Sequence, residues 1–71
     1  MQSIAYKIDI ALAMAKMNRS ELADKVGYKK SNLSAMLKRD TYKTEELEKI
    51  ARAMGYELEI NFINPETKER I

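Results

Sequence analysis

The sequence has no cysteine, no histidine and no tryptophan, and it has one proline and two glycines among 71 residues. Without cysteine there are no disulfides, and without cysteine and histidine the usual zinc ligands are missing, so we expect no metal and no cofactor. The commonest general base and the thiol nucleophile are absent as well. We therefore expect no catalytic residues and no enzymatic activity. The lack of cysteine also fits a cytoplasmic protein.

Long hydrophobic runs are also missing. The longest apolar run near the N-terminus covers residues 10–15, between Asp9 and Lys16. It is too short to span a membrane and lacks the layout of a secretory signal, so no membrane association is expected. Hydrophobic residues make up 45% of the chain and charged residues 34%, proportions that are typical of one folded globular domain.

The net charge of +2 is unevenly distributed. Residues 1–54 contain 11 Lys or Arg and 7 Asp or Glu, whereas residues 55–71 contain 2 and 4. Residues 29–43 alone hold five cations and one carboxylate. A basic middle followed by an acidic end indicates a polyanionic partner that contacts the middle of the chain.

Apolar residues recur at helical spacing in four segments, namely residues 3–16, 21–26, 30–39 and 45–54. Ser3 at the start of the first segment, and Ser20 and Thr44 just before the second and the fourth, are predicted to be N-caps, because their hydroxyl groups accept hydrogen bonds from free helical N–H groups. Gly27 and Gly55 are expected to end helices. Met14, Met36 and Met54 occupy helical faces that need filling, so we expect them in the core.

After Gly55 the period changes from 3.6 to 2, because apolar Tyr56, Leu58, Ile60 and Phe62 alternate with polar residues. This alternation predicts a strand over residues 56–63, followed by a turn and a frayed tail over 64–71. No second strand is visible in the chain. The simplest prediction is antiparallel pairing of this strand with its copy in a homodimer, in which these four residues form the dimer contact. The alternative is an extended tail along its own subunit.

The segment around the two central helices carries the most specific pattern. Ala23 is small enough for two helices to cross closely, and Gly27, four residues later, tolerates a left-handed turn. Leu33 and Met36 then hold the second helix of the pair against the first. The opposite face of that second helix remains exposed, and it is rich in lysine, serine and asparagine.

These features resemble the lambda-repressor-like (Cro/repressor-type) helix-turn-helix regulators over residues 4–55. The resemblance is carried by SELADKVG at 20–27, SNLSAM at 31–36 and LEKIARAMG at 47–55. It implies a mainly α fold, in which residues 1–55 form a four-helix DNA-binding domain. Residues 56–63 add the C-terminal β-strand, the candidate dimerisation element.

By this resemblance the second helix of the pair enters the major groove of duplex DNA. The residues that match base-contacting positions, or lie beside them, are Lys30, Ser31, Asn32, Ser34 and Ala35. Lysine donates to guanine, asparagine pairs with adenine, and the alanine methyl meets a thymine methyl. The predicted phosphate contacts are Arg19, Lys29, Lys38, Arg39 and Lys43. The sequence leaves two roles open for Tyr28 and Tyr42: contact with the DNA backbone, or packing at the protein surface.

The sequence thus predicts a sequence-specific transcriptional regulator, a repressor that binds a palindromic operator as a homodimer. The alternative is an antitoxin-like module that binds a partner protein and uses DNA binding for autoregulation. Only residues after Gly55 offer such a partner an additional surface. For the basic residues, the alternative interpretation in both cases is a solvated surface that binds no ligand.

Overall fold

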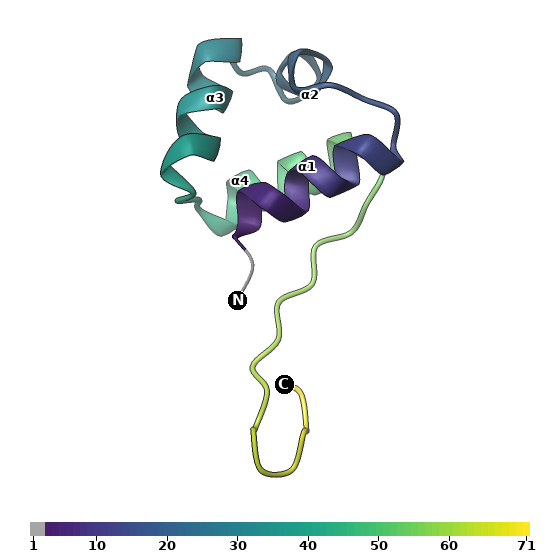
Figure 1. Ribbon diagram of the computed structural model, residues 1–71, viewed down its shortest axis with the longest axis vertical. Coiled ribbons are helices and arrows are strands. Elements are labelled where there is room, and N and C mark those ends of the chain that lie inside the picture. Colours follow the sequence, from purple (N-terminus) through teal and green to yellow (C-terminus); the bar gives the residue numbers. More distant parts are fainter. Residues whose placement is uncertain (1–2) are drawn as a thin grey trace.

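The computed structural model describes residues 3–71 and confirms the four predicted helices (Figure 1). They are α1 (Ile4–Met14), α2 (Arg19–Val26), α3 (Lys30–Arg39) and α4 (Thr44–Ala53). Helix α2 packs against both α3 and α4. The chain after α4 leaves the helical domain on the side away from α2 and extends from it (Figure 1), which gives the molecule dimensions of 42 × 23 × 19 Å.

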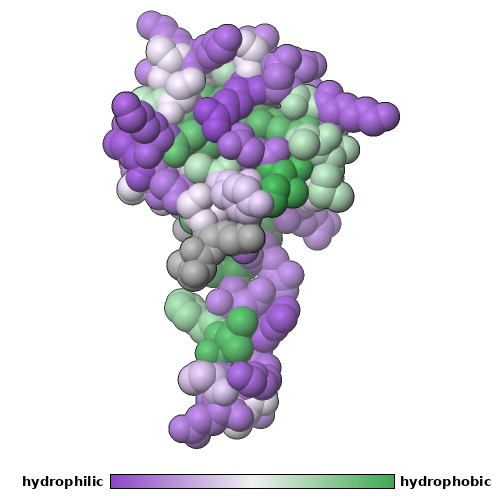
Figure 2. All heavy atoms as spheres, in the orientation of Figure 1, coloured by the Kyte–Doolittle hydropathy of each residue, from purple (hydrophilic) through white to green (hydrophobic). Residues whose placement is uncertain are grey.

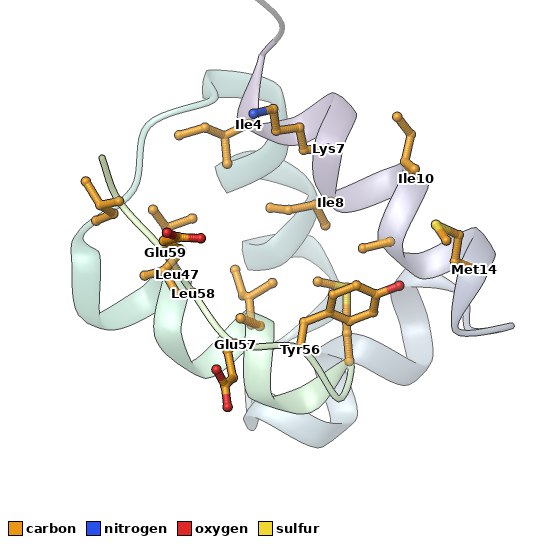
Figure 3. Close-up of a pocket in the computed structure, with 15 residues that line it drawn as sticks. Ile4, Lys7, Ile8, Ile10, Met14, Leu47, Tyr56, Glu57, Leu58 and Glu59 are labelled. Atoms are coloured by element: carbon orange, nitrogen blue, oxygen red, sulfur yellow. The ribbon is translucent and has the colours of Figure 1, made fainter. Parts of the chain in front are cut away.

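The core is formed by one apolar face from each helix. Leu22, Leu33 and Ile50, one from each of the last three helices, are its largest fully buried side chains. Ile8 and Leu12 of α1 cover them at the one-turn spacing that the sequence predicts. The prediction for Met14 is wrong, because its side chain is 71% exposed. It lies in the last turn of α1, where it lines a groove together with Tyr56 of the C-terminal segment (Figure 3).

Helix boundaries confirm some predicted caps and correct others. Ser3 Oγ accepts a hydrogen bond from Tyr6 N at 3.0 Å, so the cap of α1 is confirmed. The Ser20 cap is wrong, because α2 begins at Arg19 and its cap is Asn18. Asn18 Oδ1 accepts from Glu21 N at 2.8 Å, and Glu21 Oε1 accepts from Asn18 N at 3.2 Å. This reciprocal pair satisfies two N–H groups at once, whereas a cap at Ser20 alone would satisfy one.

The start of α4 also differs by one residue. Thr44 is the first helical residue rather than the cap, and Lys43 occupies the N-cap position. Glu46 Oε1 accepts a hydrogen bond from Lys43 N at 2.8 Å. The predicted ends are confirmed, since Gly27 and Gly55 have φ angles of 78° and 80°. Both angles lie in the left-handed region, which glycine adopts without the steric cost of a Cβ atom.

A polar contact fixes the start of α1 against the loop between α3 and α4. Asp40 Oδ1 accepts a hydrogen bond from Ala5 N at 2.7 Å and another from the Tyr42 hydroxyl at 3.0 Å. The N–H of Ala5 belongs to the first turn of α1 and has no partner within its own helix. Asp40, 35 residues away in the sequence, therefore satisfies a second N–H group of the turn that Ser3 caps.

This contact makes stability sensitive to alkaline pH. Burial, followed by the hydrogen bond to Asp40, raises the pKa of the Tyr42 hydroxyl far above its usual value. Above about pH 10 the unfolded chain loses this proton while the native protein keeps it. The free energy of unfolding should therefore fall as pH rises past about 10. Urea titrations at about pH 9 and pH 11 measure this fall. Between these two pH values, the free energy of unfolding should fall less for Tyr42→Phe than for the unsubstituted protein. Equal losses would contradict this assignment.

No strand is present within residues 3–71, so the predicted strand over 56–63 is not found. Residues 57–61 belong to no helix or strand and run out from the helical domain as a drawn-out stretch of chain (Figure 1), and residues 62–71 fold back on themselves around a turn. The N–H groups of Phe62 and Ile71 donate to each other's carbonyl groups at 3.0 and 2.9 Å. Asn64 N donates to Glu69 O at 2.9 Å, and Ile63 and Arg70 form an isolated antiparallel bridge. The final residues thus return along the chain instead of ending as a free tail.

Within the described range, no helix has both the length and the apolar character that crossing a membrane requires.

Candidate nucleic-acid interface

The pair α2 and α3 is built around two small residues. Ala23 is 1% exposed, which allows the backbone of α2 to approach its neighbours closely. After Gly27 reverses the chain, Tyr28 N donates to Ala23 O at 2.9 Å and closes the turn. Leu22 and Leu33 then pack in the same buried cluster. The crossing of the two helices therefore rests on the residues that the sequence pattern singles out.

Helix α3 has one buried face and one exposed face. Leu33 and Met36 are buried, as predicted, and Leu37 is buried beside them. The five candidate base-contacting residues are all exposed, namely Lys30, Ser31, Asn32, Ser34 and Ala35. Ser31, Ser34, Ala35 and Lys38 follow helical spacing and occupy the middle of the exposed face, while Lys30 and Asn32 flank it. The face consists of short side chains between longer polar ones, so a duplex can approach the helix closely.

Cations surround this face at both ends of α3. Lys29 precedes the helix, Lys38 and Arg39 lie in its last turn, and Lys43 precedes α4. All four side chains are exposed. Across residues 3–71 the ion pairs are Asp9–Arg19 and Glu48–Arg52, so these four cations have no carboxylate partner there. Exposed cations around a helix face make the surface positively charged, as surfaces that bind the phosphates of nucleic acids are.

Arg19, the fifth predicted phosphate contact, differs from the other four. Its Nη2 lies 2.8 Å from Asp9 Oδ2 and its Nε lies 3.1 Å from Asp9 Oδ1. This pairing raises the pKa of Arg19 above its usual value. Both side chains are about half-exposed, so the pair lies at the surface. Asp9 was not singled out from the sequence, because nothing in the local pattern links it to a residue ten positions later.

The two tyrosines near this surface have structural partners. Tyr42 donates its hydroxyl hydrogen bond to Asp40 and packs against the core. Tyr28 is half-buried and packs against the same cluster. Of the two interpretations left open by the sequence, the structure thus favours packing for Tyr42.

The predicted dimerisation residues remain accessible. Leu58 is half-buried, and Tyr56, Ile60 and Phe62 are increasingly exposed along the segment, up to 76% at Phe62. The alternative prediction, an extended tail that lies along its own subunit, therefore fits only the first residues of the segment 56–63.

Comparison with known proteins identifies one family. The family described as Cro/C1-type HTH DNA-binding domain matches residues 7–59. This range includes α2, α3 and α4 completely, most of α1 and the first residues after α4. Comparison of the chain with curated proteins and with solved structures finds no match.

Proposed function

Since the chain belongs to the family of Cro/C1-type helix-turn-helix (HTH) DNA-binding domains, we propose that it is a sequence-specific transcriptional repressor that reads duplex DNA with α3. The observation that carries the proposal is the exposed face of α3, which presents Lys30, Asn32 and Ala35 between clusters of exposed cations. In the major groove, lysine and asparagine read guanine and adenine, and the alanine methyl contacts thymine. The cations at both ends of α3 contact phosphates.

We further propose that the protein binds a palindromic operator as a homodimer. The segment from Tyr56 to Phe62 supports this, because it is apolar on alternate residues and three of these four apolar side chains are exposed. Two copies of α3 related by a two-fold axis then read half-sites about 10 bp apart, or a multiple of that distance.

The test separates base contacts from phosphate contacts. A preferred site is first selected from a random pool of duplex DNA, and affinities for that site and for a scrambled duplex are then measured at one salt concentration. Lys30→Ala and Asn32→Ala should each weaken the preferred site by about 1–3 kcal/mol and leave the scrambled duplex nearly unchanged. Lys38→Ala should weaken both duplexes by a similar factor.

Lys49→Ala is the matched control. Lys49 is exposed on α4 and lies outside the proposed surface, so this substitution removes the same charge without a DNA contact. Lys49→Ala should change the affinities for the preferred site and for the scrambled duplex only by the small effect of net charge. If Lys30→Ala and Lys38→Ala affect the two duplexes alike, the division into base and phosphate contacts is wrong. If selection enriches no sequence, the protein is not a sequence-specific regulator.

A further inference from the structure

Exposed hydrophobic side chains are concentrated in two places. The structure has nine large hydrophobic residues that are exposed within residues 3–71. Five of them line one groove, namely Ile4, Ile10, Met14, Tyr56 and Ile60. Three more, Phe62, Ile63 and Ile71, lie in residues 62–71, which we call the C-terminal hairpin. Only Tyr6 lies outside both places. Because single exposed apolar residues are normally scattered, this concentration indicates a contact surface.

The groove lies between α1 and the chain that follows α4, and its volume is about 510 Å³. Ile10 and Met14 of α1 lie on one side, while Leu47 of α4 and Leu58 line the opposite side (Figure 3). Lys7 on α1 and the carboxylates of Glu57 and Glu59 are its charged lining residues. A volume in the range of about 300–1,000 Å³ accepts a group the size of several side chains.

The C-terminal hairpin is apolar but does not cover its own domain. Phe62 and Ile71 are 76% and 89% exposed, although hydrogen bonds join their backbones. The hairpin projects beyond the helices (Figure 1), and hydrophobic side chains lie on the surface of this projection (Figure 2). It follows directly after the segment that forms one wall of the groove, so it points away from the groove of its own chain.

The segment that forms this wall of the groove has free backbone groups. Tyr56 N donates to Ala51 O, and the next backbone hydrogen bond along the described chain is that of Phe62. Residues 57–61 therefore present extended backbone without a partner inside residues 3–71. Such an edge pairs readily with another extended segment.

We propose that the groove binds the C-terminal hairpin of a second copy, so that the two subunits of the dimer exchange hairpins. This inference rests on the proposed homodimer and specifies its contacts. Antiparallel pairing of residues 58–62 around Ile60 brings Phe62 of one chain opposite Leu58 of the other. Leu58 lines the groove, so the pairing carries each hairpin to the groove of its partner.

The chemistry of the two surfaces agrees with this arrangement. Both are apolar at the centre, and both carry charges of each sign at the edge: Lys7 and two glutamates on the groove, and Glu66, Lys68, Glu69 and Arg70 on the hairpin. The two-fold axis repeats the exchange, so each dimer covers two grooves and two hairpins. Pairing around Ile60 also avoids placing two copies of Glu59 directly opposite each other, which like charge disfavours.

Because the chain has no cysteine, the contact can be tested by introduced disulfides. A Met14→Cys protein is mixed with a Phe62→Cys protein of different mass under mild oxidation, without DNA. We expect a mixed disulfide dimer containing one chain of each. The mixture of Tyr6→Cys with Phe62→Cys is the matched control, because Tyr6 is 52% exposed but lies outside the groove, and it should form at least about tenfold less mixed dimer.

Sedimentation of cysteine-free variants provides the second measurement. Phe62→Ala should weaken dimerisation at least about tenfold, while Tyr6→Ala should leave it within about twofold. A stable dimer without the mixed disulfide overturns the hairpin exchange but leaves the homodimer of the proposed function intact. A disulfide within one chain of the double variant Met14→Cys/Phe62→Cys shows that the hairpin closes on its own groove, which overturns the exchange. A protein that stays monomeric overturns both and favours a different protein as occupant.

Discussion

Raising the salt concentration is expected to weaken DNA binding by about a thousandfold between about 50 and 200 mM, with a log–log slope on the order of −5 or steeper. Each lysine or arginine that neutralises a phosphate displaces condensed counterions, and added salt opposes their release. Lys29, Lys38, Arg39 and Lys43 are exposed and without carboxylate partners across residues 3–71, so several cations are available to neutralise phosphates in the proposed complex. Titrations of one duplex at several salt concentrations measure the slope.

Variants identify which cations contribute to that slope. Lys38→Ala should make it shallower by about 1 per subunit, because one phosphate contact is lost. Lys49→Ala, which removes an equal charge from the exposed surface of α4, should leave the slope unchanged. An affinity that does not depend on salt would remove the basis for a phosphate-contacting surface around α3.

Leu33→Ala is expected to reduce the free energy of unfolding by about 2–5 kcal/mol. Leu33 has no exposed surface and packs with Leu22 and Ile50 at the centre of the core. Its truncation leaves a cavity between α3 and the other helices, which rigid backbones fill only in part. A domain of this size is typically stable by about 4–10 kcal/mol, so the loss is a large part of the total. Urea denaturation followed by circular dichroism measures it.

The neighbouring position supplies the control for this substitution. Ser34 is the next residue of the same helix and is exposed, so Ser34→Ala should change the free energy of unfolding by no more than about 0.5 kcal/mol. DNA affinity should fall with Leu33→Ala only as far as the folded fraction falls. A Leu33→Ala protein as stable as Ser34→Ala would show that α3 is not held by the core described above.

The sequence by itself determined the four helices, the turn between α2 and α3, and the two faces of α3. These features depend on interactions between residues close in sequence: the 3.6-residue period of Leu33, Met36 and Leu37, and the left-handed backbone at Gly27. Even the errors at Ser20 and Thr44 displaced a helix start by one or two residues, because several neighbouring polar residues can cap the same turn.

Only the tertiary structure decided the interactions between residues far apart in the sequence. The Asp9–Arg19 pair and the bond from Ala5 N to Asp40 depend on how α1 packs, which no local pattern encodes. Alternation after Gly55 predicted a strand, but a strand requires a neighbour for its N–H and C=O groups. Within residues 3–71, the segment 57–61 has no such neighbour. The alternation after Gly55 therefore specifies which side chains share a face. Which segment pairs with that face is determined by folding and assembly.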